Sequence, residues 1–196
     1  MRKFSNRYIF IYSALLVSVV AVVLTIVSIS LKPLQQRNYR VEQKQMILKA
    51  IGIDAQASNA EELYVQHIQE CEVNGLTYYR FEGGIVIPMH GTGLWGPIWG
   101  YLALDSTSTV VGAVFDHKGE TPGLGGEIAS DKFASRFVGK SMREYPIRLK
   151  KNADRNSLYE VDAISGGTMT SNGVTAMLES THKQYFTLLF GCRNEE

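Results

Sequence analysis

The chain has 196 residues, which suits about one domain, and its 20 basic and 19 acidic side chains leave a formal net charge of +1. With 45% hydrophobic and 20% charged residues, the composition excludes a disordered chain, a collagen-like fibre and a polybasic nucleic-acid-binding protein. Its two cysteines, Cys71 and Cys192, are too few for a disulfide scaffold, and the sequence leaves open whether they pair.

The first feature along the chain is an apolar run at residues 8–31. No Asp, Glu, Lys, Arg, His, Pro or Gly interrupts it, and about 20 apolar residues in a helix are enough to cross the core of a bilayer. Positive charge precedes the run at Arg2, Lys3 and Arg7. Because a positive flank stays in the cytoplasm, we expect a cytoplasmic tail at residues 1–7 and a periplasmic location for everything after the span.

The alternative for this run is a cleaved signal peptide, with Ser28-Ile29-Ser30 as a small-residue cleavage site. Signal peptides usually have shorter apolar regions of about 7–15 residues, which favours a membrane anchor. The polar side chains inside the run are hydroxyls alone. Since ionisable residues normally mark ion and proton paths within membranes, we expect the span to anchor the protein rather than to conduct ions by itself.

Next comes a region expected to be helical, at residues 32–70. One helix is predicted to continue from the membrane and to end near Gly52. A second helix is predicted at about residues 60–70, because Ser58 followed by Glu61 and Glu62 resembles a capping box.

The remaining residues, 71–196, are predicted to form one domain. Apolar and β-branched runs predict strands at residues 78–81, 84–88, 98–104, 109–115, 147–150 and 158–164, with a short helix at 129–138. A final amphipathic helix is expected to start near residues 170–172, where three N-cap residue types cluster. The expected fold class is α+β, with a twisted, antiparallel-rich sheet packed by helices.

Three glycine-rich segments are unusual for a plain scaffold: residues 91–100, 117–127 and 162–173. Glycine allows the backbone to approach a ligand closely. Leu94, Trp95 and Leu124 stand among these glycines, and large apolar side chains framed by exposed backbone suit a flat heteroaromatic ligand. The alternative is a set of tight turns around a core tryptophan.

The third segment also predicts an anion site. Ser165-Gly166-Gly167-Thr168 leads directly into the final helix, and a helix N-terminus stabilises a phosphate through its free N–H groups and its dipole. The hydroxyl of Thr168 would lie beside such a phosphate. The alternative is a helix cap rich in Ser and Thr without a ligand.

The common catalytic patterns are not found in this sequence. The four histidines have no metal-binding spacing, and neither a G-x-S-x-G elbow nor a Walker loop occurs. Glu120, next to Thr121 and Pro122, is expected from its neighbours to be a solvated turn residue rather than a base.

Taken together and in this order, three motifs resemble those of a known family. They read GLWGPIWGYLALD at 93–105, HKGETPGLGGEI at 117–128 and DAISGGTMTSNGV at 162–174. They are similar to the FMN-binding domain of the C subunit of sodium-translocating NADH:quinone reductases, to which the G subunit of the Rnf complex is related. The resemblance extends over nearly the whole chain, and the G-L-W and S-N-G-V segments favour the sodium-pump subunit.

The resemblance implies that FMN is joined through its phosphate to Thr168, by a phosphoester bond that a separate flavin transferase makes. Gly167 stands where alanine is usual in the family motif, and Thr170 is the alternative attachment residue. The implied FMN-binding residues, besides Thr168, are Leu94, Trp95, Glu120, Thr121, Gly123, Leu124, Gly125, Ser165, Gly166, Gly167, Thr170 and Ser171.

The resemblance further implies a membrane-anchored flavoprotein subunit in the bacterial inner membrane. Such a subunit relays electrons among other membrane subunits of a redox-driven sodium pump, and it neither binds NADH nor moves sodium by itself, since it has no complete active site. Two alternatives remain at this point: an Rnf-type or stand-alone flavinylated electron carrier, and a periplasmic binding or assembly module without a cofactor. No nucleic-acid or metal partner is expected.

Overall fold

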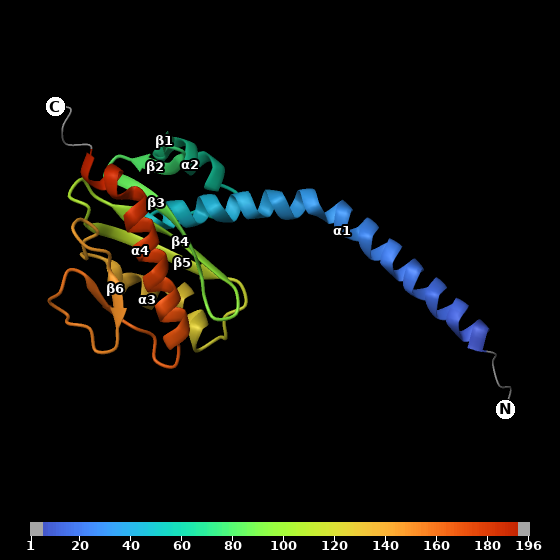
Figure 1. The fold of residues 1–196 in the computed structure, drawn as a ribbon. Coiled ribbons are helices and arrows are strands. Elements are labelled where there is room, and N and C mark those ends of the chain that lie inside the picture. Colours follow the sequence, from blue (N-terminus) through green and yellow to red (C-terminus); the bar gives the residue numbers. More distant parts are fainter. Residues whose placement is uncertain (1–5, 192–196) are drawn as a thin grey trace. The chain divides into compact units, whose positions relative to one another are not determined.

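A computed structural model describes the backbone of residues 6–191 and the side chains up to Tyr185. The chain forms two compact units, Met1–Glu42 and Gln43–Glu196, and one long helix, α1 (Asn6–Ala50), contributes to both (Figure 1). Cys192 lies outside the described residues, so its pairing with Cys71 stays open.

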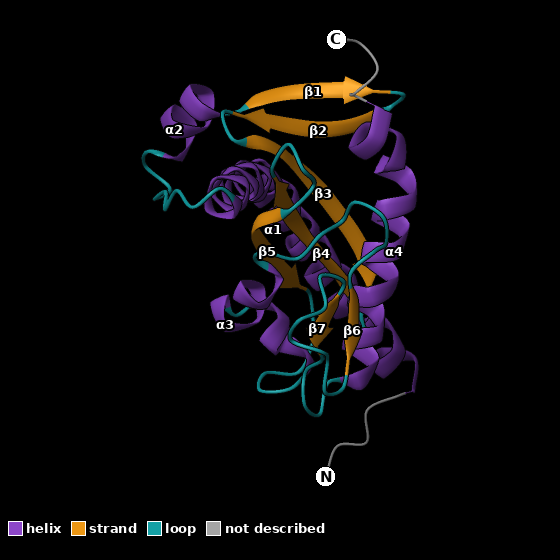
Figure 2. Ribbon diagram, turned by 90° about the vertical axis from the view of Figure 1, so that its left-hand side faces the viewer, coloured by secondary structure: helices purple, strands orange, loops and turns teal. Residues whose placement is uncertain are grey.

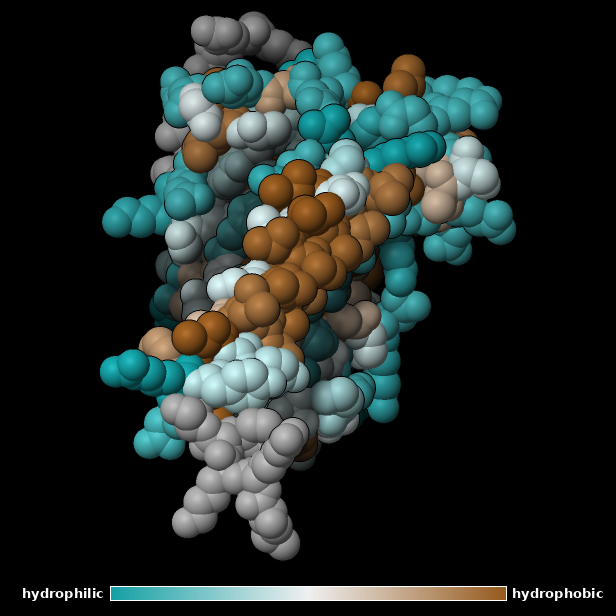
Figure 3. Space-filling model, turned by 90° about the vertical axis from the view of Figure 1, so that its right-hand side faces the viewer, coloured by the Kyte–Doolittle hydropathy of each residue, from teal (hydrophilic) through white to brown (hydrophobic). Residues whose placement is uncertain are grey.

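Within the first unit, residues 8–31 of α1 form a continuous apolar stretch of helix. Its side chains are exposed throughout, and the face of the molecule seen in Figure 3 carries a mostly hydrophobic band with a few paler side chains in it. The helix is long and apolar enough to cross a membrane. The first proline of the chain, Pro33, stands inside α1, just after this apolar part.

The second unit is built on a five-stranded sheet in which every neighbouring pair is antiparallel. The strands follow one another in chain order: β1 (Gln69–Val73), β2 (Leu76–Phe81), β3 (Gly84–Thr92), β4 (Pro97–Leu104) and β5 (Val110–His117). Successive side chains of a strand point to opposite faces. In β4, Leu102 therefore belongs to one buried cluster and Ala103 to the other.

Helices cover both faces of this sheet (Figure 2). The last turns of α1, from Gln43, and α2 (Ala60–His67) pack on one face through residues such as Leu48 and Tyr64. The other face carries α4 (Thr168–Gly191) together with several short elements. These elements are η1 (Gly125–Ala129), α3 (Asp131–Ala134), η2 (Ser135–Phe137) and the parallel pair β6 (Arg148–Lys150) and β7 (Glu160–Asp162).

The structure confirms the α+β class and corrects several boundaries. The helix expected at residues 60–70 ends at His67, and β1, which the sequence analysis missed, begins at Gln69. The signal for β1 is the Asn74-Gly75 dipeptide, which connects β1 to β2. Both residues have positive φ, 51° and 77°, and Asn-Gly is the preferred sequence of a two-residue hairpin turn.

The expected cap of α2 and the expected start of the final helix are also wrong, although α2 does begin at Ala60 as expected. Ser58 does not cap α2: Asn59 is the N-cap residue, and its side chain accepts a hydrogen bond from the Gln56 N–H, at 2.8 Å, instead of from the helix. The final helix begins at Thr168, two residues earlier than expected. The hydroxyls of Thr170 and Ser171 therefore lie inside its first turn and contact other segments.

Candidate functional site

The three glycine-rich segments meet at one end of the five-stranded sheet. The first forms the tight turn between β3 and β4, closed by a hydrogen bond from the Gly93 N–H to the Gly96 carbonyl at 2.8 Å. The second leaves the end of β5, where His117 pairs with Ile98 at the start of β4. The third enters α4 at Thr168. The sequence prediction that these segments share one site is consistent with this arrangement.

Glycine at position 173 brings α4 to the same end. A Cβ at Gly173 would lie 2.3 Å from the carbonyl oxygen of Thr92, the last residue of β3. The helix backbone therefore contacts the sheet directly, which a side chain at this position would prevent. The second and third segments touch as well, because a Cβ at Gly166 would lie 2.7 Å from Cδ2 of Leu124.

The carboxylate of Glu120 links the three segments. Its Oε1 accepts a hydrogen bond from the Trp95 N–H at 2.8 Å, and its Oε2 accepts one from the Thr170 hydroxyl at 2.5 Å. Glu120 is only 4% exposed. The expectation of a solvated turn residue is therefore wrong. The sequence next to Glu120 does look like an exposed turn, but the donors that bury its side chain come from positions 25 and 50 residues away.

Two glycines leave the space that this carboxylate occupies. A Cβ at Gly93 would lie 2.5 Å from Oε1 of Glu120, and a Cβ at Gly125 would lie 2.4 Å from Oε2. Any side chain at these positions would collide with the buried carboxylate. This requirement explains Gly93 and Gly125 better than ligand contact alone does.

The hydrogen bonds keep Glu120 ionised. Burial by itself raises the pKa of a carboxyl group, but the hydrogen bonds from the Thr170 hydroxyl and from the backbone of Trp95, Leu94 and Gly96 outweigh it, so that the pKa of Glu120 is lowered. Thr170 lies in the first turn of α4, whose positive dipole end also favours a negative charge. Glu120 is thus a buried anion whose two carboxylate oxygens each accept a hydrogen bond, which offsets the cost of burying the charge.

The hydroxyl groups at the start of α4 have different surroundings. Thr168, the first residue of the helix, is exposed. Thr170 is 1% exposed and donates to Glu120, and Ser171 is buried and accepts a hydrogen bond from the Ile164 N–H at 3.0 Å. Thr168 is therefore the one of these three hydroxyls that a large molecule can reach.

Large apolar side chains surround the segments on the outside. The exposed fractions are 51% for Leu94, 69% for Trp95, 44% for Leu124 and 59% for Met169. We call these four residues the apolar rim. They stand on the three segments that meet at this end of the sheet, and an exposed apolar patch is typical of a binding surface. Met169 was missed by the sequence analysis, although its place beside Thr168 and off the buried face of α4 was a usable signal.

The predicted site residues thus divide into two groups. An exposed group contains Leu94, Trp95, Thr121, Gly123, Leu124, Ser165, Gly166 and Thr168, and a buried group beneath it contains Glu120, Gly125, Gly167, Thr170 and Ser171. Gly93, which touches the Glu120 carboxylate, was not among the predicted residues.

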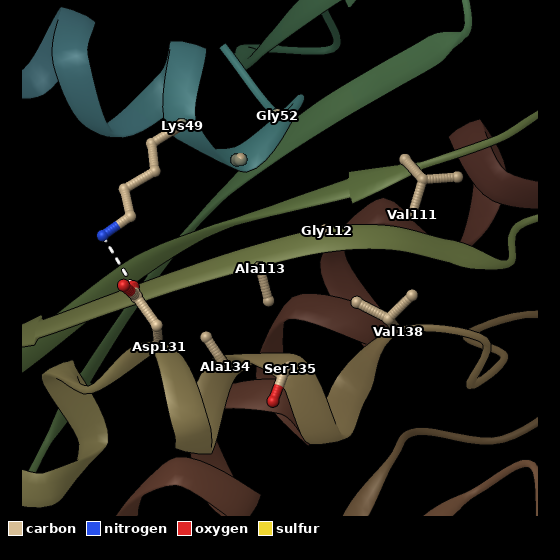
Figure 4. Close-up of a pocket in the computed structure, with 10 residues that line it drawn as sticks. Lys49, Gly52, Val111, Gly112, Ala113, Asp131, Ala134, Ser135 and Val138 are labelled. Atoms are coloured by element: carbon tan, nitrogen blue, oxygen red, sulfur yellow. Dashed lines mark ion pairs between the residues drawn. The ribbon is translucent and has the colours of Figure 1, made fainter. Parts of the chain in front are cut away.

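A separate pocket of about 200 Å³ lies away from this site, and none of the predicted site residues lines it (Figure 4). The end of α1, β5 and the segment 131–138 form its walls, with an ion pair between Lys49 and Asp131 at 2.6 Å. Small and aliphatic side chains make up most of the lining (Figure 4), and both members of the ion pair are already satisfied by each other. The pocket lacks convergent polar groups that would orient a ligand.

The glycine-rich region lies within a stretch of the chain that matches a known protein family. Residues 93–183 match the FMN-binding domain family. The C subunit of the Na(+)-translocating NADH-quinone reductase of Vibrio alginolyticus is 25% identical over 210 residues, covering 80% of this chain and 82% of the relative. The counterpart in Neisseria meningitidis serogroup A is 39% identical over 97 residues, covering 47% of this chain and 38% of the relative.

Solved structures extend this similarity to the fold. The crystal structure of the C subunit from Parabacteroides distasonis is 31% identical, has a TM-score of 0.70, and matches over 82% of this chain and 97% of that chain. NqrC of Shewanella oneidensis, at 20% identity and a TM-score of 0.67, shares the fold over 80% of this chain and 99% of its own. With its three motifs, its fold and these relatives, the chain belongs to the family of C subunits of Na(+)-translocating NADH-quinone reductases.

Proposed function

We propose that this chain carries FMN covalently on Thr168 and relays electrons within a membrane-bound, sodium-translocating NADH:quinone reductase. Family membership and the FMN-binding domain support a flavoprotein subunit of a redox complex, and such a subunit implies other subunits as partners. The observation that carries the attachment site is the exposed hydroxyl of Thr168, at the first residue of α4 and beside the apolar rim.

The start of α4 suits a phosphodiester. The first N–H groups of a helix have no partner within the helix, and the positive end of its dipole favours an anion there. At the start of α4, the first helical hydrogen bond runs from the Ser171 N–H to the Gly167 carbonyl, at 2.8 Å. Oγ1 of Thr168 would attack the flavin-bearing phosphorus of an activated flavin nucleotide: the O–P bond would form as the bond from that phosphorus to its nucleotide leaving group breaks, and the hydroxyl would lose its proton. The product would exceed the unmodified chain by one FMN less one water. The flavin transferase would make this bond.

The apolar rim suits the isoalloxazine ring. Leu94, Trp95 and Leu124 offer large apolar surfaces next to the exposed backbone of residues 121–123, and flat heteroaromatic ligands bind in such surroundings. When bound, the flavin supplies the chemistry of accepting and passing on electrons. The part of this chain is to hold the group at one position and to keep its ring partly shielded from water.

Residues 8–31 are proposed to anchor the subunit in the inner membrane. Their apolar side chains are exposed in the structure, and the basic flank at Arg2, Lys3 and Arg7 favours a cytoplasmic N-terminus. The helical region 32–70 and the domain 71–196 would then lie in the periplasm. Reporter enzymes that are active only in the periplasm should be active when fused after Tyr185 and inactive when fused before Tyr8.

The attachment site can be tested with the full-length protein. We would co-express it with a flavin transferase, denature it, and record flavin fluorescence in a gel together with the intact mass. The wild type should fluoresce, and its mass should exceed that of unmodified protein by one FMN less water. The variant Thr168→Ala should be dark, whereas Thr77→Ala, which changes an exposed threonine on β2, should fluoresce like the wild type.

Peptide mapping then decides the residue. Fragmentation of the modified peptide should place the flavin on Thr168. A flavin on Thr170, or an unmodified wild-type protein in the presence of a transferase that labels another substrate, would refute the proposed attachment site.

A further inference from the structure

We infer that Glu120 and Thr170 form a positioning pair, which holds the flavin site in its binding shape before FMN is attached. The role of the pair in flavin binding rests on the proposed function, whereas its hydrogen bonds are observed in the structure. The pair joins all three segments: Glu120 belongs to the second, Thr170 to the third, and Oε1 of Glu120 holds the Trp95 N–H of the first.

The pair acts beneath the site and does not form its surface. Glu120 and Thr170 are 4% and 1% exposed, whereas Trp95, whose N–H donates to Glu120, is 69% exposed. The backbone that carries Leu94 and Trp95 is thus fixed from the buried side, and their side chains remain outside. A tight turn rich in glycine would otherwise sample many conformations, because glycine restricts the backbone least.

The charge of Glu120 strengthens this link. A hydrogen bond to an ionised acceptor is shorter and about twice as strong as one between neutral groups. The close approach of Gly93 and Gly125 to the two carboxylate oxygens leaves no space for water between them. Loss of either partner would therefore leave a buried polar group unsatisfied, which is costlier than the loss of an exposed hydrogen bond.

The same geometry changes the role of Thr170. Its hydroxyl donates to Glu120 and is buried, so a phosphoester at this oxygen would have to break the pair and open the site. The structure therefore assigns different tasks to two threonines one residue apart: Thr168 for attachment and Thr170 for positioning. Substitution of Thr170 should impair flavin loading although the flavin is not bound to it.

The first test uses the full-length protein expressed without flavin transferase, so that it does not depend on flavin attachment. Backbone hydrogen exchange is measured for the segment 93–96. The variants Glu120→Gln and Thr170→Val keep side-chain size but remove the charge or the hydroxyl. We expect each to speed exchange at Trp95 about tenfold or more, whereas Glu144→Gln, a change at an exposed carboxylate, should leave it unchanged.

The second test compares initial rates of flavin loading by a transferase at equal protein concentration. Glu120→Gln and Thr170→Val should each load about tenfold more slowly or worse, and Thr170→Ser, which keeps the hydroxyl, should restore loading. The double variant should be no worse than the slower single variant, because two residues of one interaction are not additive. Visible circular dichroism of the loaded variants should shift toward that of free FMN, since the rim is no longer fixed around the ring.

The two tests separate the possible failures. Unchanged exchange at Trp95 in both variants would overturn the positioning pair, whatever the flavin data show. Faster exchange with unchanged loading would overturn its role in attachment. Failure of the wild type to load would refute the proposed function, whereas the exchange result would still decide whether the pair holds the three segments together. Thermal unfolding of each variant checks that the domain is folded.

Discussion

The sheet core and the proposed flavin site are held together in opposite ways. On one face of the sheet, the rings of Phe115, Phe133 and Phe137 pack at centroid distances of 4.8–5.4 Å, and all three are at most 2% exposed. At the end of the same sheet, three backbone segments converge on the single carboxylate of Glu120, which accepts hydrogen bonds from Trp95 and Thr170.

Because of this difference, we expect the core to determine the stability of the domain and the site to determine flavin binding. Many apolar contacts hold the core, and each contributes in proportion to the area that it buries. A few strong, directional hydrogen bonds hold the site. We therefore expect core substitutions to unfold the domain and site substitutions to affect flavin loading well before they affect folding.

The largest expected effect on stability comes from the core. Phe137→Ala removes a fully buried ring and leaves a cavity beside Phe115 and Phe133, so we expect a loss of about 3–5 kcal/mol in the free energy of unfolding. Urea denaturation of the full-length protein in detergent, followed by tryptophan fluorescence, measures it. A loss below about 1 kcal/mol would mean that the core is less tightly packed than described.

Glu120→Gln should have a smaller effect on unfolding. It keeps the shape of the side chain but weakens the hydrogen bonds from Thr170 and Trp95, so we expect a loss of about 1–3 kcal/mol at neutral pH. The matched control, Glu144→Gln, should change the free energy of unfolding by less than about 0.5 kcal/mol. Equal losses in the two variants would show that Glu120 has no special stabilising role.

Low pH should weaken the contribution of Glu120 to the stability of the wild-type protein. The pKa of Glu120 is lowered on folding, chiefly by its hydrogen bonds against the effect of burial. Its stabilising contribution is therefore complete above about pH 4.5 and is lost as the pH falls through the lower, folded-state pKa. Denaturation midpoints between about pH 3 and pH 7 should fall more steeply for the wild type than for Glu120→Gln. Parallel curves would contradict this expectation.

The smallest effect on stability is expected at the apolar rim. Trp95 is largely exposed, so Trp95→Ala should change the free energy of unfolding by no more than about 0.5 kcal/mol. In the flavin-loaded protein, the same variant should increase flavin fluorescence, because an indole close to the ring quenches it. Unchanged fluorescence would place the ring away from Trp95 and remove one wall of the proposed site.

Strong local patterns predicted most of the fold. The apolar run at residues 8–31, the alternating strands and the period of the last helix each reflect interactions between near neighbours, and all of them appear in the structure. β1 was missed because its sequence, Gln-Glu-Cys-Glu-Val, is polar and its side chains lie mostly exposed beside β2. The turn residues Asn74 and Gly75 carried the signal instead.

The structure brings together the three glycine-rich segments that the sequence singled out, but the contacts within them could not be predicted. The glycine spacing and the motif Ser165-Gly166-Gly167-Thr168 indicated which segments matter. The burial of Glu120 and the different surroundings of Thr168 and Thr170 depend on contacts across 25 and 50 residues, and one-dimensional spacing cannot show such contacts. A helix start that differs by two residues also changes which hydroxyls face inward.

The end of α1 has a practical consequence for work on a soluble fragment. Ile47, Leu48 and Ala50 belong to the same helix as the apolar segment, yet each is at most 1% exposed and packs against the sheet. A truncation that removes the hydrophobic segment but keeps the chain from Gln43 onward should preserve this layer. Removal of residues 1–52 would instead uncover Val86 and Ala103, and we expect that shorter fragment to aggregate during purification.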